Sequence, residues 1–251
     1  MGSTAVLTDI EGTTTDIAFV HQVLFPYSRD HLPGFLRANA NNAEVAAALA
    51  ELRAMENAPA LAVDAAITIL LRWIAEDRKA KPLKTLQGLI WMEGYKRGEL
   101  RGHIYPDALA ALRRWHEAGT PLYIYSSGSV AAQKLLFGHT GDGDLRPLFS
   151  GYFDTAVGSK MEAESYFRIA EILGRPSRSI LFLSDNAGEL QAASAAGFRV
   201  IQVDRSRPLD LPPAMSGSTP VVSGFHQIDP DSPTGVGATQ LPRSLATKSL
   251  M

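Results

Sequence analysis

The sequence predicts an α/β fold, in which a doubly wound parallel sheet is covered by helices and a helical segment is inserted after the first strand. Three observations lead to this fold class. A short apolar run at residues 5–8 stops at an acidic turn, residues 19–98 show only helical periodicity, and beyond Pro106 apolar runs alternate with helical segments. Because those later runs are almost continuously apolar, we expect their strands to be parallel and buried on both faces.

The first predicted strand, residues 5–8, ends where polar residues begin. Asp9 follows the strand directly, and Glu11 stands two residues further along a glycine-containing turn that extends to Asp16. In parallel α/β sheets, ligands bind beyond the carboxyl ends of the strands. We therefore expect this turn to carry functional groups.

The inserted segment, residues 19–98, has the pattern of several packed helices. Apolar residues recur at intervals of three and four in three groups: Val45, Leu49 and Leu52; Ile67, Leu70, Leu71 and Ile74; and Leu86, Leu89 and Ile90. A break at residues 57–59 separates the first two groups, and Asp64 is the predicted N-cap of the second helix.

The second half of the chain supplies the rest of the predicted sheet. We predict helices near residues 107–118, 130–137, 162–173 and 188–196, and strands at 121–125, 153–157, 180–183 and 199–203, with room for an edge strand near 221–225. The core is then residues 1–18 and 99–228. Seven of the fifteen prolines fall beyond residue 204, so residues 229–251 are expected to form a disordered tail.

Composition narrows the class of partner. The 251 residues carry a formal net charge of -2, so no basic surface for nucleic acid or anionic lipid is expected. Zero cysteines exclude disulfides, a thiol nucleophile and cysteine-bound zinc. No apolar run approaches the roughly 18 residues of a membrane span, and the early Asp9 argues against a signal peptide. We expect a cytoplasmic protein that acts on small molecules and has no membrane or nucleic-acid partner.

Polar residues follow four segments of the predicted sheet, and each is a candidate site residue. The candidates are Asp9 and Glu11 after the first strand, Ser126 and Ser127 after the second, Lys160 after the third, and Asp185 after the fourth. This set combines a carboxylate nucleophile, hydroxyl and amide donors, one ammonium and a second carboxylate. It has the groups that phosphoryl transfer needs.

Phosphoryl transfer gives each candidate a role. A phosphate monoester dianion repels an anionic nucleophile, so Asp9 can attack phosphorus only if Mg²⁺ and a cation such as Lys160 neutralise the phosphoryl oxygens. The carboxylates of Asp9 and Asp185 and the backbone carbonyl of Glu11 are hard oxygen ligands suited to Mg²⁺. The Glu11 side chain is placed to protonate the leaving oxygen and later to activate water.

The serine pair is the predicted phosphate-binding loop. The Ser126 hydroxyl lies before a predicted helix, where its own oxygen and the backbone amides of Ser127 and Gly128 can bind a phosphoryl group. Ser129 is interpreted as a helix cap.

These motifs, in this order, resemble the haloacid dehalogenase superfamily of aspartate-nucleophile phosphatases. More narrowly, they are similar to the enolase-phosphatase E1 family, in which a glutamate at the second acidic position, here Glu11, is typical. The segments that carry this narrower resemblance are residues 8–14, 90–96, 102–105, 124–130, 133–139 and 164–166. The resemblance extends over residues 5–203, and the helical insertion corresponds to the family's cap domain.

The resemblance implies an enzyme with two activities in one site. It would enolise 2,3-diketo-5-methylthiopentyl-1-phosphate and then remove its phosphate, giving the acireductone of methionine salvage, as a monomer with one Mg²⁺ per subunit. The resemblance places metal ligation on Asp9, Glu11 and Asp185. It implies substrate binding by Ser126, Ser127 and Lys160, and catalysis by Asp9, Glu11 and Lys160.

Several alternatives stay open at this point. The base for enolisation is not identified, and Glu11, Glu93 and Lys160 are candidates. Glu189 is the next acid after Asp185 and is interpreted as a supporting residue. His103 is interpreted as hinge packing, with substrate contact as the alternative. The competing functions are a phosphatase of the same superfamily with another small metabolite as substrate, a dehalogenase, and a catalytically silent binding module.

Overall fold

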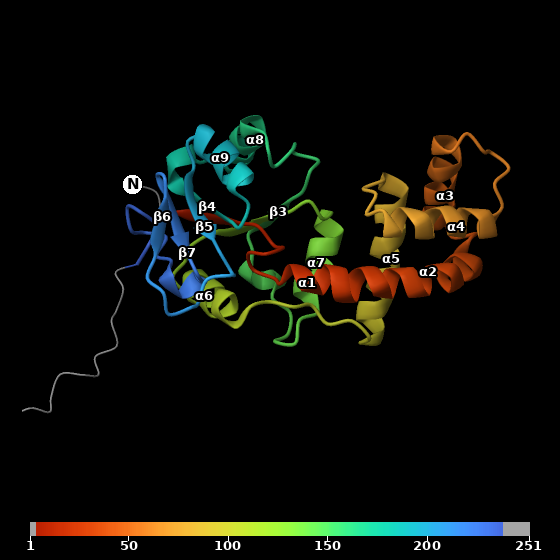
Figure 1. Ribbon diagram of the computed structural model, residues 1–251, viewed down its shortest axis with the longest axis horizontal. Helices are drawn as coiled ribbons and strands as arrows, with labels where there is room; N and C mark the ends of the chain where they lie inside the picture. Colours follow the sequence, from red (N-terminus) through yellow and green to blue (C-terminus); the bar gives the residue numbers. More distant parts are fainter. Residues whose placement is uncertain (1–3, 238–251) are drawn as a thin grey trace, which may run out of the picture. The chain divides into compact units, whose positions relative to one another are not determined.

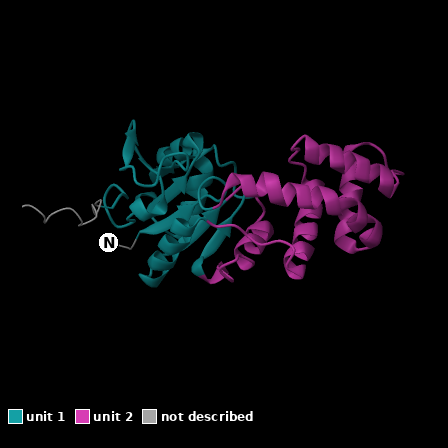
Figure 2. Cartoon of the chain, turned by 60° about the horizontal axis from the view of Figure 1, so that its bottom comes forward, with its two compact units in different colours: residues 1–14, 105–125, 148–251 teal, residues 15–104, 126–147 magenta. Residues whose placement is uncertain are grey.

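The computed structural model describes residues 4–237 as two compact units. Of these residues, unit 1 comprises 4–14, 105–125 and 148–237, and unit 2 comprises Thr15–Ile104 and Ser126–Pro147 (Figure 2). The chain therefore passes from one unit to the other after residues 14, 104, 125 and 147. Among residues 4–237, no helix combines the length and the apolar content needed to cross a membrane.

Unit 1 is built on a seven-stranded sheet in the order β3-β2-β1-β4-β5-β7-β6. The strands are β1 (Ala5–Thr8), β2 (Leu122–Tyr125), β3 (Gly151–Phe153), β4 (Ile180–Ser184), β5 (Arg199–Val203), β6 (Ala214–Ser216) and β7 (Thr219–Val222). All neighbours are parallel except β6 and β7. The chain winds outward from β1 in both directions, which confirms the predicted doubly wound sheet and makes β1 the topological switch point.

The central strands are buried along their whole length. Every residue of β1 and β4 is buried, and Leu7 pairs with Tyr123 of β2 on one side and with Phe182 of β4 on the other. This explains why these runs lack the alternation of polar and apolar residues that a half-exposed strand shows.

Helices cover both faces of this sheet. In Figure 1, α8 (Ala163–Leu173) and α9 (Ala187–Ala195) lie on one face and α6 (Pro106–Glu117) lies on the other. One core cluster joins β1, β4, α8 and α9 around Tyr166, whose ring packs edge-on against Phe182. Two 3₁₀ turns, Ser177–Ser179 and Phe225–Gln227, complete the unit, and a third at Arg146–Leu148 spans the boundary after residue 147.

Two predicted strands differ from the structure. The predicted strand at residues 153–157 is displaced, because β3 ends at Phe153 and a turn closed by the Asp154 carboxylate and the Ala156 amide follows at 2.9 Å. The predicted edge strand near 221–225 is β7, and it is not an edge strand because β6 pairs outside it.

Unit 2 is helical. It comprises α1 (Ile17–Phe19), a π-helical turn (Val20–Leu24), α2 (Phe25–Asn39), α3 (Ala43–Met55), α4 (Val63–Ala75), α5 (Lys81–Arg97) and α7 (Val130–Gly138). The three apolar stripes predicted from sequence meet in one core, which includes the fully buried Trp73. The prediction that Asp64 is the N-cap of α4 is wrong. Ala62 takes that place, and the Asp64 carboxylate lies in the first turn, bonded to Arg37 at 2.9 Å.

The compact helical unit contains more of the chain than the insertion predicted at residues 19–98. The segment after β2, with α7, belongs to unit 2. There the His139 ring stacks on Tyr95 of α5 with centroids 5.1 Å apart, and the His139 carbonyl accepts a hydrogen bond from Gly102 N at 2.8 Å.

The first part of the predicted disordered tail is held against the sheet. Arg199, the first residue of β5, donates to the carbonyl oxygens of Pro230 (2.9 Å) and Ser232, and Asp229 N donates to Gly235 O at 2.9 Å. One guanidinium thus satisfies two loop carbonyls, which composition alone does not reveal. The rest of the predicted tail, residues 238–251, lies outside the described residues.

We expect Arg199→Ala to release residues 229–237 with little effect on the carboxyl ends of the parallel strands. The loss of charge-assisted hydrogen bonds predicts a decrease in the free energy of unfolding of about 1–3 kcal/mol. Thermal denaturation and limited proteolysis would measure both effects. Unchanged protease resistance of residues 229–237 would contradict this account.

Candidate active site

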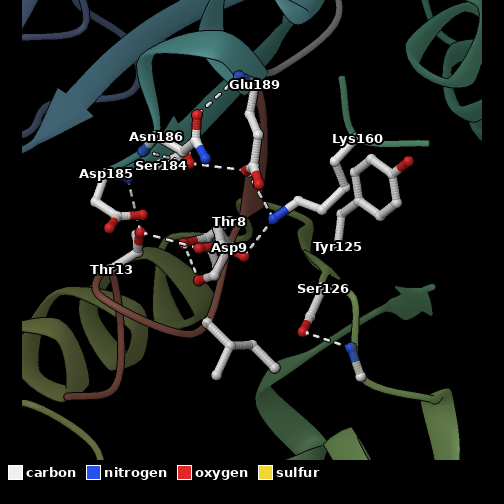
Figure 3. A network of polar contacts seen from close by, with 12 residues as sticks. Thr8, Asp9, Thr13, Tyr125, Ser126, Lys160, Ser184, Asp185, Asn186 and Glu189 are labelled. Atoms are coloured by element: carbon white, nitrogen blue, oxygen red, sulfur yellow. Dashed lines mark hydrogen bonds and ion pairs between the residues drawn. The ribbon is translucent and has the colours of Figure 1, made fainter. Parts of the chain in front are cut away.

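Asp9 lies directly beyond β1, at the switch point of the sheet. Its amide continues the ladder by donating to Leu183 O at 2.9 Å, and its carbonyl accepts hydrogen bonds from the hydroxyls of Thr8 (3.0 Å) and Thr14 (3.2 Å). Asp9 is only 4% exposed. The backbone at this position is therefore fixed on both sides, which orients a buried carboxylate (Figure 3).

Both oxygens of the Asp9 carboxylate have partners. Oδ1 accepts a hydrogen bond from the ammonium of Lys160, and Oδ2 accepts one from the hydroxyl of Thr13 at 3.3 Å. Burying a carboxylate is costly unless it is paired. The Lys160 ammonium and the Thr13 hydroxyl supply these partners to the Asp9 carboxylate.

Lys160 lies between two carboxylates. Its Nζ contacts Asp9 and also Oε2 of Glu189 at 2.7 Å, and its backbone carbonyl accepts a hydrogen bond from the Tyr166 hydroxyl at 2.8 Å. Burial by itself lowers the pKa of the Lys160 ammonium, but the charges of Asp9 and Glu189 outweigh it and leave the pKa raised. The two carboxylates therefore favour the protonated form of Lys160.

Glu189 reaches this cluster from the first turn of α9. Asn186 caps that helix, which makes Glu189 its third residue and turns the side chain back toward the end of β4, where Ser184 Oγ donates to Oε2 at 2.9 Å. Burial and then the Asp9 charge raise the pKa of Glu189, while Lys160 opposes the shift. The sequence assigned Glu189 only a supporting role. Its spacing from Asp185, one helical turn, is the signal that could have placed it here.

Asp185 is joined to Asp9 through one threonine. The Asp185 amide donates to Thr13 Oγ1 at 3.0 Å, and the same hydroxyl donates to the Asp9 carboxylate. Gly12 lies beside them in a left-handed conformation (φ 76°), and a Cβ there would stand 2.3 Å from Asp185 Oδ2. Only glycine permits this approach of the turn to the carboxylate.

The acidic residues at this edge of the sheet suit a divalent metal. Asp9 and Asp185 offer carboxylates, and the half-buried Glu11 stands two residues beyond Asp9. Burial and then the Asp9 charge raise the pKa of Asp185, a sign that negative charge here lacks full compensation. Residues 4–237 contain no group of three or more metal-ligating side chains. Two carboxylates and one backbone carbonyl nevertheless fit Mg²⁺, which retains several waters.

The serine loop belongs to unit 2 and is well ordered by its own contacts. Ser126 is bonded to the last residue of β2 and is fully buried, and its hydroxyl accepts a hydrogen bond from Gly128 N at 3.1 Å. Lys84 Nζ donates to Ser127 O at 3.3 Å. Ser129 caps α7, as predicted. Binding of a phosphoryl group by Ser126 and Ser127 stays a prediction.

The remaining candidates have structural partners. Glu93 forms an ion pair with Arg97 one turn further along α5, at 2.8 Å. The Asp16 amide donates to Nδ1 of His103 at 3.1 Å, close to where the chain leaves and re-enters unit 1. This supports the interpretation of His103 as hinge packing.

Comparison with known proteins agrees with this geometry. A family model described as haloacid dehalogenase-like hydrolase matches residues 4–197. The enolase-phosphatase E1 of Azotobacter vinelandii is 55% identical over 90% of this chain and 97% of its own length. The chain belongs to the enolase-phosphatase E1 family of haloacid dehalogenase-like hydrolases. The member from Pseudomonas aeruginosa is 57% identical over 80% of this chain and 89% of its own length.

Among solved structures, the UTR4 protein of Saccharomyces cerevisiae shares the fold across both units. It has a TM-score of 0.75 and 32% identity, covering 90% of this chain and all of that one. Family membership confirms the resemblance drawn from the motifs around Asp9 and Asp185.

The raised pKa values predict a pH dependence of stability for the metal-free protein. Because the pKa of Asp185 in the folded state lies above its ordinary value of 3.8, the folded state binds more protons than the unfolded chain across that interval, and stability falls as the pH rises through it. Glu189 contributes in the same direction.

Asp185→Asn should therefore raise the melting temperature of the metal-free protein at neutral pH, with the gain vanishing below pH 3.8, where the wild-type carboxyl is protonated. Thermal melts across the pH range with a chelator present would measure it. A lower melting temperature for the variant at neutral pH would contradict the assigned direction.

Proposed function

We propose that the protein is a magnesium-dependent enolase-phosphatase. It converts 2,3-diketo-5-methylthiopentyl-1-phosphate to the acireductone 1,2-dihydroxy-3-keto-5-methylthiopentene and phosphate, a step of methionine salvage. The observation that carries the proposal is the buried Asp9 carboxylate at the switch point, ion-paired to Lys160, in a chain whose relatives are named enolase-phosphatase E1.

The phosphatase step follows from the groups around Asp9. An Asp9 oxygen attacks phosphorus, the bond from phosphorus to the substrate oxygen breaks, and Glu11 protonates the departing oxygen. Water then hydrolyses the aspartyl-phosphate, with Glu11 accepting its proton. Lys160, which forms an ion pair with Glu189, keeps a positive charge beside the Asp9 carboxylate while that carboxylate gains and loses the phosphoryl group.

We infer one Mg²⁺ per subunit, held by the carboxylates of Asp9 and Asp185 and the backbone carbonyl of Glu11. When bound, it would neutralise phosphoryl oxygens and acidify the carbon next to the diketone. Ser126 and Ser127 are the proposed phosphate-binding residues, because they follow β2, the neighbour of β1, and precede the N-terminus of α7.

The raised pKa of Lys160 reduces the number of candidates for the base that removes a proton in the enolisation step. A base must lose its proton before it can accept one, and the raised pKa of Lys160 keeps its ammonium protonated at neutral pH. This argues against Lys160. Of the three candidates, Glu11 and Glu93 remain.

The test of the proposed function is an assay of the purified protein with the diketone phosphate, with and without Mg²⁺, following enol absorbance and free phosphate together. Both signals, only with Mg²⁺, would support the proposal. Phosphate without enol absorbance would indicate a phosphatase of another small phosphorylated metabolite, and neither signal from folded protein would reject the reaction.

Asp9→Asn should abolish turnover while the fold is retained, since the amide keeps the size of the side chain but cannot form the aspartyl-phosphate. Loss of a covalent nucleophile predicts a fall in kcat of at least about 1000-fold. Asp30→Asn, in an exposed ion pair with Arg29, is the control and should retain full activity. Turnover by Asp9→Asn at the wild-type rate would refute Asp9 as nucleophile.

A monomeric state, a cytoplasmic location and the lack of nucleic-acid and membrane partners stay predictions. They rest on the net charge, the absence of cysteine and the family resemblance.

A further inference from the structure

Arg205 is a partly buried arginine beyond the carboxyl ends of the parallel strands, where Asp9 also lies, and the reaction as proposed does not use it. It stands two residues beyond β5. Its Nε and Nη2 donate to the backbone carbonyl of Thr13 at 3.0 and 2.6 Å, and its Nη1 donates to Asp107 Oδ2 at 2.8 Å. The side chains of Arg205 and Asp107 are only 12% and 16% exposed.

The orientation of this guanidinium is fixed from several directions. Its Cζ lies 4.2 Å from the centre of the Tyr105 ring and 5.3 Å from that of Phe225. The same oxygen of Asp107 also accepts a hydrogen bond from the amide of Phe225 at 2.7 Å. A planar fork held between two rings and one carboxylate presents its donors to Thr13 O in one geometry.

Thr13 transmits this geometry to the nucleophile. Its hydroxyl donates to Asp9 Oδ2 at 3.3 Å and accepts from the Asp185 amide at 3.0 Å. The carbonyl of Thr13 is held by Arg205 while its side chain joins Asp9 to Asp185. Movement at the carbonyl would displace the hydroxyl that orients the nucleophile.

Arg205 also contacts the two points at which the chain leaves unit 1 for the long helical segment and returns from it. The chain leaves unit 1 after Thr14, one residue beyond the carbonyl that Arg205 holds, and returns at Tyr105, whose ring Arg205 contacts. The Tyr105 amide donates to Thr14 O at 2.9 Å, so the two passages are hydrogen-bonded to each other.

We propose that Arg205 is a positioning residue that holds the Asp9 turn in its reactive conformation and fixes the outgoing and returning chain at the edge of unit 1. Asp107 is the counterion that orients it. The inference rests on the proposed function insofar as Asp9 is the nucleophile. The clamp on Thr13 itself is independent of the reaction.

The expected consequence is a loss of rate without a loss of substrate affinity. Arg205→Ala removes none of the catalytic groups but frees the turn that carries Asp9, and misplacement of reacting groups by about 1 Å can cost on the order of 100-fold in rate. We expect kcat to fall by about 10- to 100-fold with KM close to the wild-type value, the pattern of an interaction that acts in the transition state.

Arg199→Ala is the matched control. Arg199 is also a partly buried arginine that holds a loop through two carbonyl oxygens. It lies at the start of β5, whereas Asp9 lies beyond the end of the parallel strand β1. Both variants should lose thermal stability. Only Arg205→Ala should lose kcat, and added millimolar guanidinium should restore part of it by occupying the vacated position.

Hydrogen exchange of the full-length wild type and both variants tests the clamp without turnover. Arg205→Ala should speed exchange of the amides in residues 10–16, and Arg199→Ala should not. Equal kcat in the two variants, or unchanged exchange in residues 10–16, would overturn the inference. If the wild type itself releases no phosphate, the proposed function fails, and the exchange measurement still decides whether Arg205 holds the turn.

Discussion

The ammonium of Lys160 is the interaction on which the rest of the site depends. Asp9, Asp185 and Glu189 bring three carboxylates to one edge of the sheet, and Lys160 contacts two of them directly. A buried ion cluster of this kind contributes little net stability compared with apolar packing. Its value is that it holds the Asp9 carboxylate in one position through direct contacts.

The surrounding fold is arranged to keep that cluster together. β1 supplies a rigid base for Asp9, the first turn of α9 directs Glu189 toward Lys160, and the hydroxyl of Thr13 connects Asp9 with Asp185. These contacts join the first segment of unit 1 to residues near the end of β4 and, through Lys160, to the start of α9. The site is therefore a property of the folded sheet and of no single motif.

Much of the fold and the main acidic residues could be predicted from sequence, because they follow from local patterns. Apolar runs located β1, β4 and β5, and the acids at strand ends identified Asp9 and Asp185. The contacts of Thr13 and Arg205 could not be predicted, since each joins residues far apart in the chain. The attachment of residues 229–237 by Arg199 was missed for the same reason, and composition favoured disorder there.

The hydrogen bond between Tyr105 N and Thr14 O bears on how such a protein can diversify. The long helical segment begins and ends at two residues that are themselves hydrogen-bonded, at 2.9 Å. The two ends of the segment therefore meet at one point of unit 1, next to β1, which pairs in parallel with β2. An ancestral sheet could acquire, enlarge or exchange such a module while the turn that carries Asp9 stayed in place, so that new ligands are reached by altering the insertion and leaving that turn unchanged.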